Sequence, residues 1–352
     1  MPSSKEDETA AAAQNLGSLS LDTSGKKDDE AEPTSKDGTQ TKLLCSACGE
    51  KSNTSTLMKC RACKCVWYCD KKCQKKHWKE HKKECKAIKK VLDERGGKLD
   101  LGEELEVGPL EKLPPREECP ICMRVLPATV SLQAYKACCG KTLCCGCNFQ
   151  HQMKSKEHPT CAFCRTAVPR SEKEALALRS KRVERKDPGC LSDMALDYGY
   201  GNYGLSVDHA KCIELLQQSA GLGYPPAQYQ LGNFHDAGEM GLQQNDQEAL
   251  KYWEKAAEGG HLLARHNAGC MENDNGNRTA AMRHWRLSAS GGSRKSITNL
   301  IAYFEDGLLH HGDLAETLQA MYLARAEMKS EDRDQYIKYL KGTGEYKAEY
   351  DL

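Results

Sequence analysis

The cysteines of this 352-residue chain are concentrated in one stretch, because 17 of the 20 lie between Cys45 and Cys164. Most belong to Cys-x2-Cys pairs, a spacing that lets two thiolates reach one metal ion. A secreted disulfide scaffold would begin with a basic and then apolar signal segment, and the start MPSSKEDETAAAAQ has none. No stretch approaches the ~20 apolar residues that a membrane span needs. We therefore expect reduced cysteines that bind zinc in an intracellular protein.

Composition divides the chain into seven segments. The first 42 residues contain almost no apolar side chains, so we expect them to be disordered. Adjacent glycines, acidic residues and a proline pair separate the two cysteine-rich segments and are typical of a linker. We predict a disordered segment (1–42), a first zinc module (43–90), a linker (91–116), a second zinc module (117–170), a connecting helix (171–187), helical repeats (188–330) and a C-terminal tail (331–352).

The sequence repeats itself in its second half. The segment QQSAGLGYPPAQYQLG at 217–232 aligns with EKAAEGGHLLARHNAG at 254–269, a shift of 37 residues, and a shift of 32 carries Trp253 onto Trp285. Periods of this size predict stacked helical pairs, in which small residues let paired helices approach closely. The equivalent positions of Trp253 and Trp285 place both in the predicted core.

The repeated pattern of Gly-x-x-Gly, an acidic residue and Ala-Ala-x-x-Gly resembles the SEL-one-like family of α-solenoid repeats, relatives of tetratricopeptide repeats. The resemblance covers about 188–330, with three clear units and a degenerate fourth at 313–330. It implies a long curved surface for protein partners. The pair His310-His311 also lies in this region, and we expect it in a solvated loop rather than at a metal.

The first zinc module offers eight candidate ligands, enough for two tetrahedral zinc ions. Two pairs have the Cys-x2-Cys spacing, and two have an x3 spacing that places both ligands on one helix face. All ligands are protein groups, so no coordination position is open for catalysis, and stripping the zinc should unfold the module. The candidates are Cys45, Cys48, Cys60, Cys63, Cys69, Cys73, His81 and Cys85.

The strings WYCDKKCQ at 67–74 and HWKEHKKEC at 77–85 make residues 45–85 closely resemble a MYND zinc finger. The resemblance implies docking of short proline-containing peptides. Cys65 and His77 fall outside its pattern, although His77 lies four residues from His81 and could replace it. The resemblance also implies interleaved ligands: Cys45, Cys48, Cys69 and Cys73 at one zinc, and Cys60, Cys63, His81 and Cys85 at the other.

The first zinc module is strongly basic, with 14 Lys and Arg against 4 Asp and Glu in residues 43–90. A lysine-rich helix at 71–90 is one signature of nucleic-acid binding. The alternative is that these lysines form the solvated face of the helix and balance the thiolate charge. We favour the solvated face.

The second zinc module resembles a RING finger over about 117–168, through CPIC at 119–122, ACCGKTLCCGC at 137–147 and CAFCR at 161–165. The RING pattern expects a ligand where this chain has Lys141, and an ammonium group cannot bind zinc. We prefer Cys138 as the replacement and keep His151 and His158 as alternatives. The resemblance implies one site of Cys119, Cys122, Cys144 and Cys147, and a second of Cys139, Cys161 and Cys164 with the replacement ligand.

RING ligases do no covalent chemistry themselves, because they hold a ubiquitin-conjugating enzyme. Ile121 matches their hydrophobic contact with that enzyme, and Arg165 matches the arginine that bridges enzyme and ubiquitin. The plain alternatives are that Ile121 packs internally and that Arg165 is a solvated charge. Ala162 in place of a proline, and the lack of Trp between Cys147 and Cys161, argue against ligase activity.

These features together predict a mostly α fold: two small cross-braced zinc-binding modules, with two Zn²⁺ each, followed by an α-solenoid of helical-hairpin repeats. No P-loop, dinucleotide-binding or hydrolase signature is present. We expect a zinc-binding adaptor for protein partners in the cytoplasm, the nucleus or both. The leading hypothesis is a RING-type ubiquitin ligase. A non-catalytic scaffold or transcriptional cofactor is the alternative, and nucleic-acid binding is a lesser one.

Overall fold

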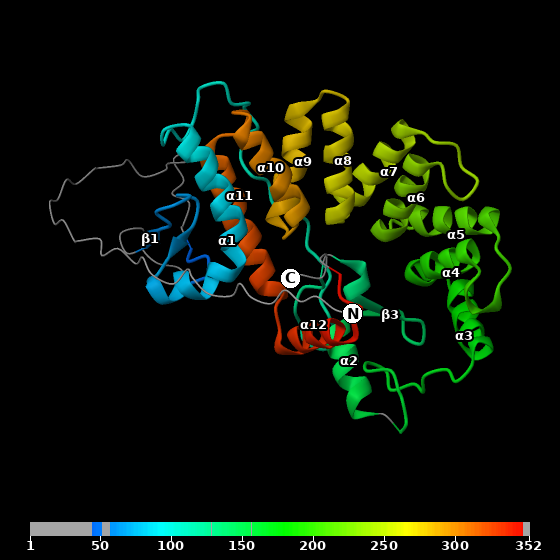
Figure 1. Cartoon of the computed structure of the whole chain (residues 1–352). Coiled ribbons are helices and arrows are strands. Elements are labelled where there is room, and N and C mark those ends of the chain that lie inside the picture. The colour runs from blue at the N-terminus through cyan, green and yellow to red at the C-terminus, as the bar shows by residue number, and fades with distance from the viewer. Residues whose placement is uncertain (1–43, 51–56, 128, 156, 348–352) are drawn as a thin grey trace, which may run out of the picture. The chain divides into compact units, whose positions relative to one another are not determined.

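Helices make up most of the computed structural model, which describes residues 44–50, 57–127, 129–155 and 157–347 (Figure 1). The predicted disorder of residues 1–42 lies outside this described part. Twelve α-helices and two short hairpins occur within it. Among the described helices, none combines the length and the apolar character that crossing a membrane requires.

The repeats form four successive helical pairs, stacked one after another (Figure 1). The helices α4, α6 and α8 begin 37 residues apart, and α8 and α10 begin 32 residues apart, as the sequence shifts predict. The pairs are α4 (Pro188–Tyr200) with α5 (His209–Gly221), α6 (Pro225–Ala237) with α7 (Asp246–Glu258), α8 (Leu262–Asp274) with α9 (Arg278–Ser290), and α10 (Arg294–Glu305) with α11 (His311–Met328).

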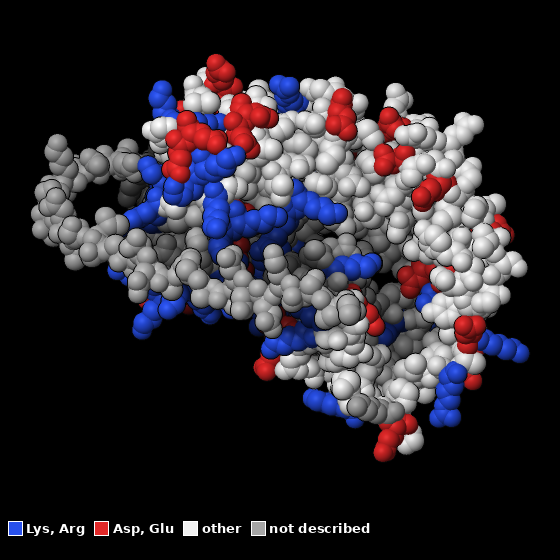
Figure 2. Space-filling model, viewed as in Figure 1, with Lys and Arg blue, Asp and Glu red and all other residues white. Residues whose placement is uncertain are grey.

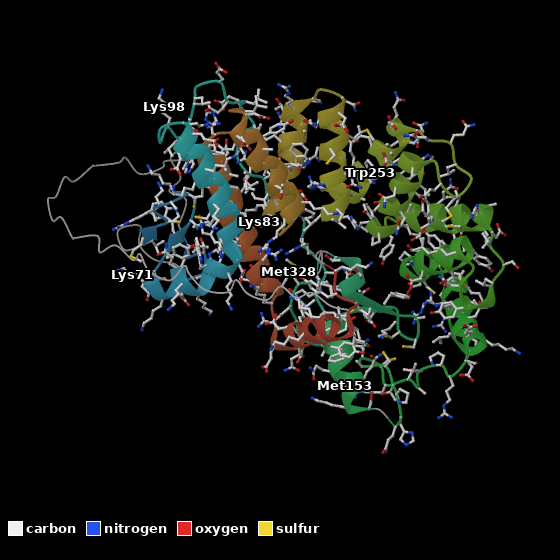
Figure 3. All side chains as sticks on the ribbon, viewed as in Figure 1. Lys71, Lys83, Lys98, Met153, Trp253 and Met328 are labelled. Atoms are coloured by element: carbon white, nitrogen blue, oxygen red, sulfur yellow. The ribbon has the colours of Figure 1, made fainter. Side chains whose placement is uncertain are left out.

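The two repeat tryptophans explain why glycine recurs in the pattern. Trp253 (labelled in Figure 3) and Trp285 are each 3% exposed, which confirms that they are core residues. A Cβ at Gly232 would lie 2.5 Å from the indole of Trp253, and a Cβ at Gly269 would lie 2.7 Å from that of Trp285. Since real Cβ atoms do not approach so closely, the missing side chain lets each indole lie against the neighbouring helix.

The first cysteine module is a small hairpin followed by one long helix. The strands β1 (Met58–Lys59) and β2 (Trp67–Tyr68) pair antiparallel. The helix α1 (Lys71–Glu94) begins at Asp70, whose side chain accepts the Cys73 N–H at 2.7 Å. One face of α1 is buried and carries two histidines and Cys85, and the other is lined with lysines.

The second cysteine module contains a 3-10 turn η2 (Val130–Leu132), an antiparallel hairpin of β3 (Gln133–Lys136) and β4 (Lys141–Cys144), and the helix α2 (Cys145–Lys154). The helix α3 (Glu172–Glu184) follows, capped by Ser171, and the short turn η3 (Asn202–Gly204) joins α4 to α5.

The predicted linker is packed against the repeats over much of its length. The Leu105 N–H donates to the carbonyl of Leu308 at 2.9 Å. Arg286 donates to the carbonyl of Gly108 at 2.7 Å, and the side chain of Val107 is buried. Residues 91–94 of the predicted linker continue α1, and residues 95–116 form a strap along the repeat helices, held by backbone groups that composition alone does not reveal.

The predicted C-terminal tail begins with a helix, α12 (Glu331–Thr343). Two residues separate it from Met328 (labelled in Figure 3), the last residue of α11. This helix packs on α2 of the second cysteine module. The ring of Phe149 lies 5.5 Å from that of Tyr336, and a Cβ at Gly146 would lie 2.6 Å from the backbone nitrogen of Arg333. The predicted tail thus includes a helix, and this helix covers one side of α2.

Candidate metal centres

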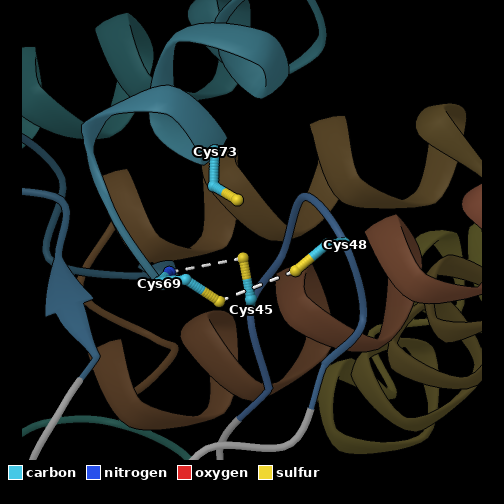
Figure 4. A group of neighbouring side chains, drawn as sticks. All are labelled: Cys45, Cys48, Cys69 and Cys73. Atoms are coloured by element: carbon cyan, nitrogen blue, oxygen red, sulfur yellow. Dashed lines mark hydrogen bonds between the residues drawn. The ribbon is translucent and has the colours of Figure 1, made fainter.

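The sixteen predicted metal ligands gather into four separate groups of four, with the ligand atoms of each group within 4.8 Å of one another. Figure 4 shows the first of these groups, in which ligands from two loops and from α1 converge. The groups are Cys45, Cys48, Cys69 and Cys73; Cys60, Cys63, His81 and Cys85; Cys119, Cys122, Cys144 and Cys147; and Cys138, Cys139, Cys161 and Cys164.

One backbone turn recurs in all four groups. After one Cys-x2-Cys pair in each group, the next residue has a positive φ: 73° at Gly49, 57° at Lys64, 54° at Met123 and 63° at Arg165. Its N–H donates to the carbonyl of the first cysteine at 2.8–3.0 Å. Only one of the four is glycine, so three non-glycine residues adopt a conformation that is uncommon for them. Because this uncommon conformation recurs in all four groups, we infer that the turn is needed to bring the two cysteines of the pair to one metal ion.

The separations of the ligand atoms fit zinc. With Zn–S bonds of about 2.3 Å, the edge of a tetrahedral site is about 3.8 Å between sulfurs. The Nε2 of His81 lies 3.3 Å from the Cys63 sulfur, the close approach expected of two ligands of one ion. One sulfur pair in each group has a separation close to this edge: Cys48–Cys69 at 3.6 Å, Cys60–Cys85 at 3.8 Å, Cys122–Cys144 at 3.9 Å and Cys138–Cys164 at 3.4 Å.

Each group contains one thiol that ionises readily. The Cys63 and Cys85 thiols donate to Cys60 and lower its pKa, and the Cys144 thiol lowers the pKa of Cys119 to about 4. Burial opposes the ionisation of Cys45, but hydrogen bonds from the N–H groups of Ala47 and Cys69 lower its pKa to about 7. The pKa of Cys164 is lowered to about 6, against burial, with Thr166 as the main hydrogen-bond partner. Since thiolates are the metal-binding form, these environments favour zinc.

His77 is placed away from the metal groups. Its Nδ1 lies 3.1 Å from the Tyr68 hydroxyl, and its ring stacks on that of His81. Burial lowers the pKa of His77 to about 4, so the ring is neutral. The structure therefore brings His81, and not His77, to the group, while Cys65 contacts His311 instead.

In the fourth group, Cys138 stands where the sequence left three alternatives. His151 lies 3.0 Å from the Thr160 hydroxyl, and His158 is exposed; neither joins a metal group of the described residues. Lys141 stands where the RING pattern has a metal ligand. Its side chain is not a ligand here, but its backbone N–H donates a hydrogen bond to the Cys139 thiol. The geometry favours Cys138 as the fourth ligand.

The expectation of a solvated loop at His310-His311 is wrong. His311 begins α11 and is buried, with its Nε2 at 2.9 Å from the Cys63 carbonyl and 3.2 Å from the Cys65 sulfur. His310 lies near two carboxylates, Asp100 and Glu104, which no sequence pattern predicted. Both histidines are partners of residues more than 200 positions earlier in the chain, and spacing alone gives no signal for such pairs.

The two predicted enzyme contacts lie at the surface of the second cysteine module. Ile121 is 42% exposed, which argues against simple internal packing, and the equivalent Phe163 of the next turn is also exposed. Arg165 is exposed and occupies the positive-φ position of its turn. Both positions are accessible to a partner.

Basic side chains gather over α1, as Figure 2 shows; Lys71 and Lys83, labelled in Figure 3, lie on this helix, and Lys98 lies just beyond its end. The helix also exposes Trp78 among them. The exposed lysines of α1 are Lys71, Lys72, Lys75, Lys76, Lys79, Lys82, Lys83, Lys86, Lys89 and Lys90.

Comparison with known families agrees with two of the three modules predicted from the sequence. Residues 45–85 match the MYND finger, and residues 190–224 and 225–261 match the Sel1 repeat. The chain contains a MYND finger and Sel1 repeats. It is thus a zinc-binding protein built of protein-interaction modules, that is, an adaptor. No curated protein matched the chain.

Two solved structures resemble parts of the chain. One is a Sel1 repeat protein from Oxalobacter formigenes, with 24% identity over 36% of this chain and 96% of that one, and a TM-score of 0.33. The other is a protective antigen of uropathogenic Escherichia coli with an SLR fold, with 25% identity over 48% of this chain and 36% of that one, and a TM-score of 0.37.

Proposed function

We propose that this adaptor brings a client protein to a ubiquitin-conjugating enzyme. In this proposal, the second cysteine module (117–170) holds the enzyme, and the MYND finger or the Sel1 repeats hold the client. The observation that carries it is the exposure of Ile121 and Arg165 on two turns of a module in which eight of the nine cysteines form two metal groups.

The packing of α12 is compatible with this role. It covers the side of α2 that carries Gly146 and Phe149, and it leaves Ile121 and Phe163 exposed. The turn at Arg165 is fixed by the bond from its N–H to the Cys161 carbonyl at 3.0 Å, which holds the backbone that presents the guanidinium. All ligands in the module are protein groups, so the bound zinc would supply shape, and the transfer itself would use the enzyme's thioester.

On the client side, the proposal assigns short proline-containing peptides to the MYND finger and unidentified clients to the repeats. We place the protein in the cytoplasm, the nucleus or both, because metal-binding thiolates persist in reducing compartments.

Ubiquitin discharge tests the proposal. The full zinc-loaded chain should accelerate release of ubiquitin to free lysine from at least one member of a panel of charged conjugating enzymes. Ile121→Ala and Arg165→Ala should each lower that rate at least about tenfold, since each removes a contact on which the activated complex depends. Lys64→Ala is the matched control for Arg165, because Lys64 holds the same position in a MYND turn, and Met123→Ala controls for Ile121.

A chain that accelerates no member of the panel would favour the non-catalytic scaffold or transcriptional cofactor. That alternative expects Ile121→Ala to leave client and peptide binding unchanged. The variants Ile121→Ala and Arg165→Ala therefore distinguish the ligase from the non-catalytic alternative.

The exposed lysines of α1, with Trp78 among them, support a second candidate function, nucleic-acid binding. Affinity for a labelled single-stranded oligonucleotide should then fall steeply with salt, because each phosphate contact releases counterions. An affinity that does not change between low and physiological salt would remove this candidate.

A further inference from the structure

We propose that Tyr322 of the repeat helix α11 is a positioning residue for the MYND ligand His81, so that zinc binding by the finger and docking of the finger on the repeats are one coupled event. This inference goes beyond ubiquitin transfer and holds whether or not the second cysteine module recruits an enzyme.

The two ring nitrogens of His81 face different partners. Its Nε2 lies 3.3 Å from the Cys63 sulfur, inside the metal group, and its Nδ1 lies 3.2 Å from the Tyr322 hydroxyl. The two residues are 241 positions apart in the chain. The phenol also donates to Glu84 Oε2 at 3.3 Å, and all three side chains are at least 96% buried.

This chain of contacts fixes the tautomer of His81. An imidazole that binds zinc through Nε2 carries its proton on Nδ1. That N–H donates to the Tyr322 oxygen, and the Tyr322 O–H donates to the Glu84 carboxylate. A metal-bound histidine commonly donates its second N–H to a partner that orients the ring, and here a tyrosine from another module takes that place.

The repeats also contact Glu84, the last residue in the series His81, Tyr322 and Glu84. Arg294 of α10 lies with its Nε 3.8 Å from Glu84 Oε1 and donates to the Glu80 carbonyl at 3.4 Å. Lys329, just after α11, pairs with the Glu80 carboxylate. The Glu84 carboxylate accepts the hydrogen bond of the Tyr322 hydroxyl. Its negative charge therefore lies close to a cation that belongs to the repeats, Arg294.

A second contact from α11 reaches the same metal group. His311 Nε2 lies 2.9 Å from the backbone carbonyl of Cys63, and the sulfur of Cys63 belongs to that metal group. The other MYND group meets α11 more remotely, through a bond from Gln319 to the Leu44 carbonyl at 2.9 Å. We therefore expect the coupling to act on the zinc of the His81 group and not on the zinc of the Cys45 group.

Coupling of this kind is reciprocal. If the repeats strengthen zinc binding at His81, then zinc at His81 strengthens docking of the repeats by the same factor. Metal removal should therefore loosen α10 and α11 as well as the finger.

Zinc release from the full chain to a colorimetric chelator tests the proposal. In Tyr322→Phe, which removes one oxygen, a single ion should leave about 10–100 times faster than in the unmodified chain, and the other ions should leave at unchanged rates. Tyr303→Phe is the matched control, because Tyr303 is a buried tyrosine of α10 whose hydroxyl bonds Asn273 and contacts no ligand. Release at unchanged rates from Tyr322→Phe overturns the proposal.

Two further measurements keep the test decisive if Tyr322→Phe folds poorly. Glu84→Gln keeps the shape of the carboxylate, removes its charge and should accelerate release of the same single ion. Hydrogen exchange of the unmodified chain should show that α10 and α11 lose protection when zinc is chelated, while α4 and α5 keep theirs. If α10 and α11 keep full protection, docking is independent of the metal and the proposal fails.

Discussion

The MYND finger and the second cysteine module share the same cysteine turn but join the rest of the chain by different means. The finger shares one hydrophobic core with the last repeat helices, and this core includes Ile88 of α1, Phe304 and Tyr322. Its His81 group is completely buried. The second module instead has arginines of α3 and α12 beside its two metal groups, in addition to the packing of α12 on α2.

Arg333 of α12 is the clearest of these arginines. It is 2% exposed and donates to the carbonyl of Val125 at 2.8 Å and to the Cys122 sulfur at 3.7 Å. At the other group, Arg182 of α3 donates to the carbonyl of Cys138 at 2.9 Å. Four thiolates on one bound Zn²⁺ would leave a net charge of about −2, which a nearby guanidinium offsets. The contrast teaches that a group with a histidine ligand is supported by a neutral hydroxyl, whereas these all-thiolate groups are supported by cations.

Chelation should have the largest effect, and it should act on both modules. Structural zinc contributes about 10–16 kcal/mol of apparent binding free energy in small fingers, so metal removal should unfold both. The helices α4 to α7 should remain folded, because their cores contain no residue of either module among the described residues. Hydrogen exchange with and without chelator checks this, and elemental analysis should find four ions per chain. Modules that stay protected without metal would contradict the assignment.

Arg333→Met should have the next largest effect and should act on the second module alone. It leaves the carbonyls of Arg124, Val125 and Met328 and the Cys122 sulfur without their buried cation, a loss of about 3–5 kcal/mol. Zinc should leave the Cys119 group faster, while the MYND zincs are retained. The exposed Lys338 of the same helix provides the control variant Lys338→Met. Equal zinc retention in the two variants would show that the guanidinium does not support the site.

The double substitution of Lys82 and Lys86 by Gln should have the smallest effect on stability. Both side chains are exposed on α1, so the free energy of unfolding should change by no more than about 0.5 kcal/mol, in contrast to the buried Arg333. Thermal unfolding of the zinc-loaded chain checks this. A large destabilisation would mean that the exposed lysines of α1 stabilise the finger. The finger would then depend on cations, as we propose for the second module.

The sequence predicts local features of this fold well. Four of the five Cys-x2-Cys pairs form the same local turn, and the shifts of 37 and 32 residues give the spacing of the repeat helices. Contacts between distant segments are different, because a single sequence contains no signal that pairs Tyr322 with His81 or Arg333 with Cys122. The same reason explains the wrong expectation for His311 and the helix within the predicted tail. The composition of the strap at 95–116 resembles any flexible connection, although its backbone bonds the repeats.

The long sequence separation between His81 and Tyr322 has a consequence for biosynthesis. The finger leaves the ribosome 241 residues before the helix that completes its surroundings. At about 5–20 residues per second, the nascent finger waits roughly 10–50 s with its inner face uncovered. During that interval its cysteines are open to oxidation and its apolar side to chaperones, so an early supply of zinc protects the chain before translation ends.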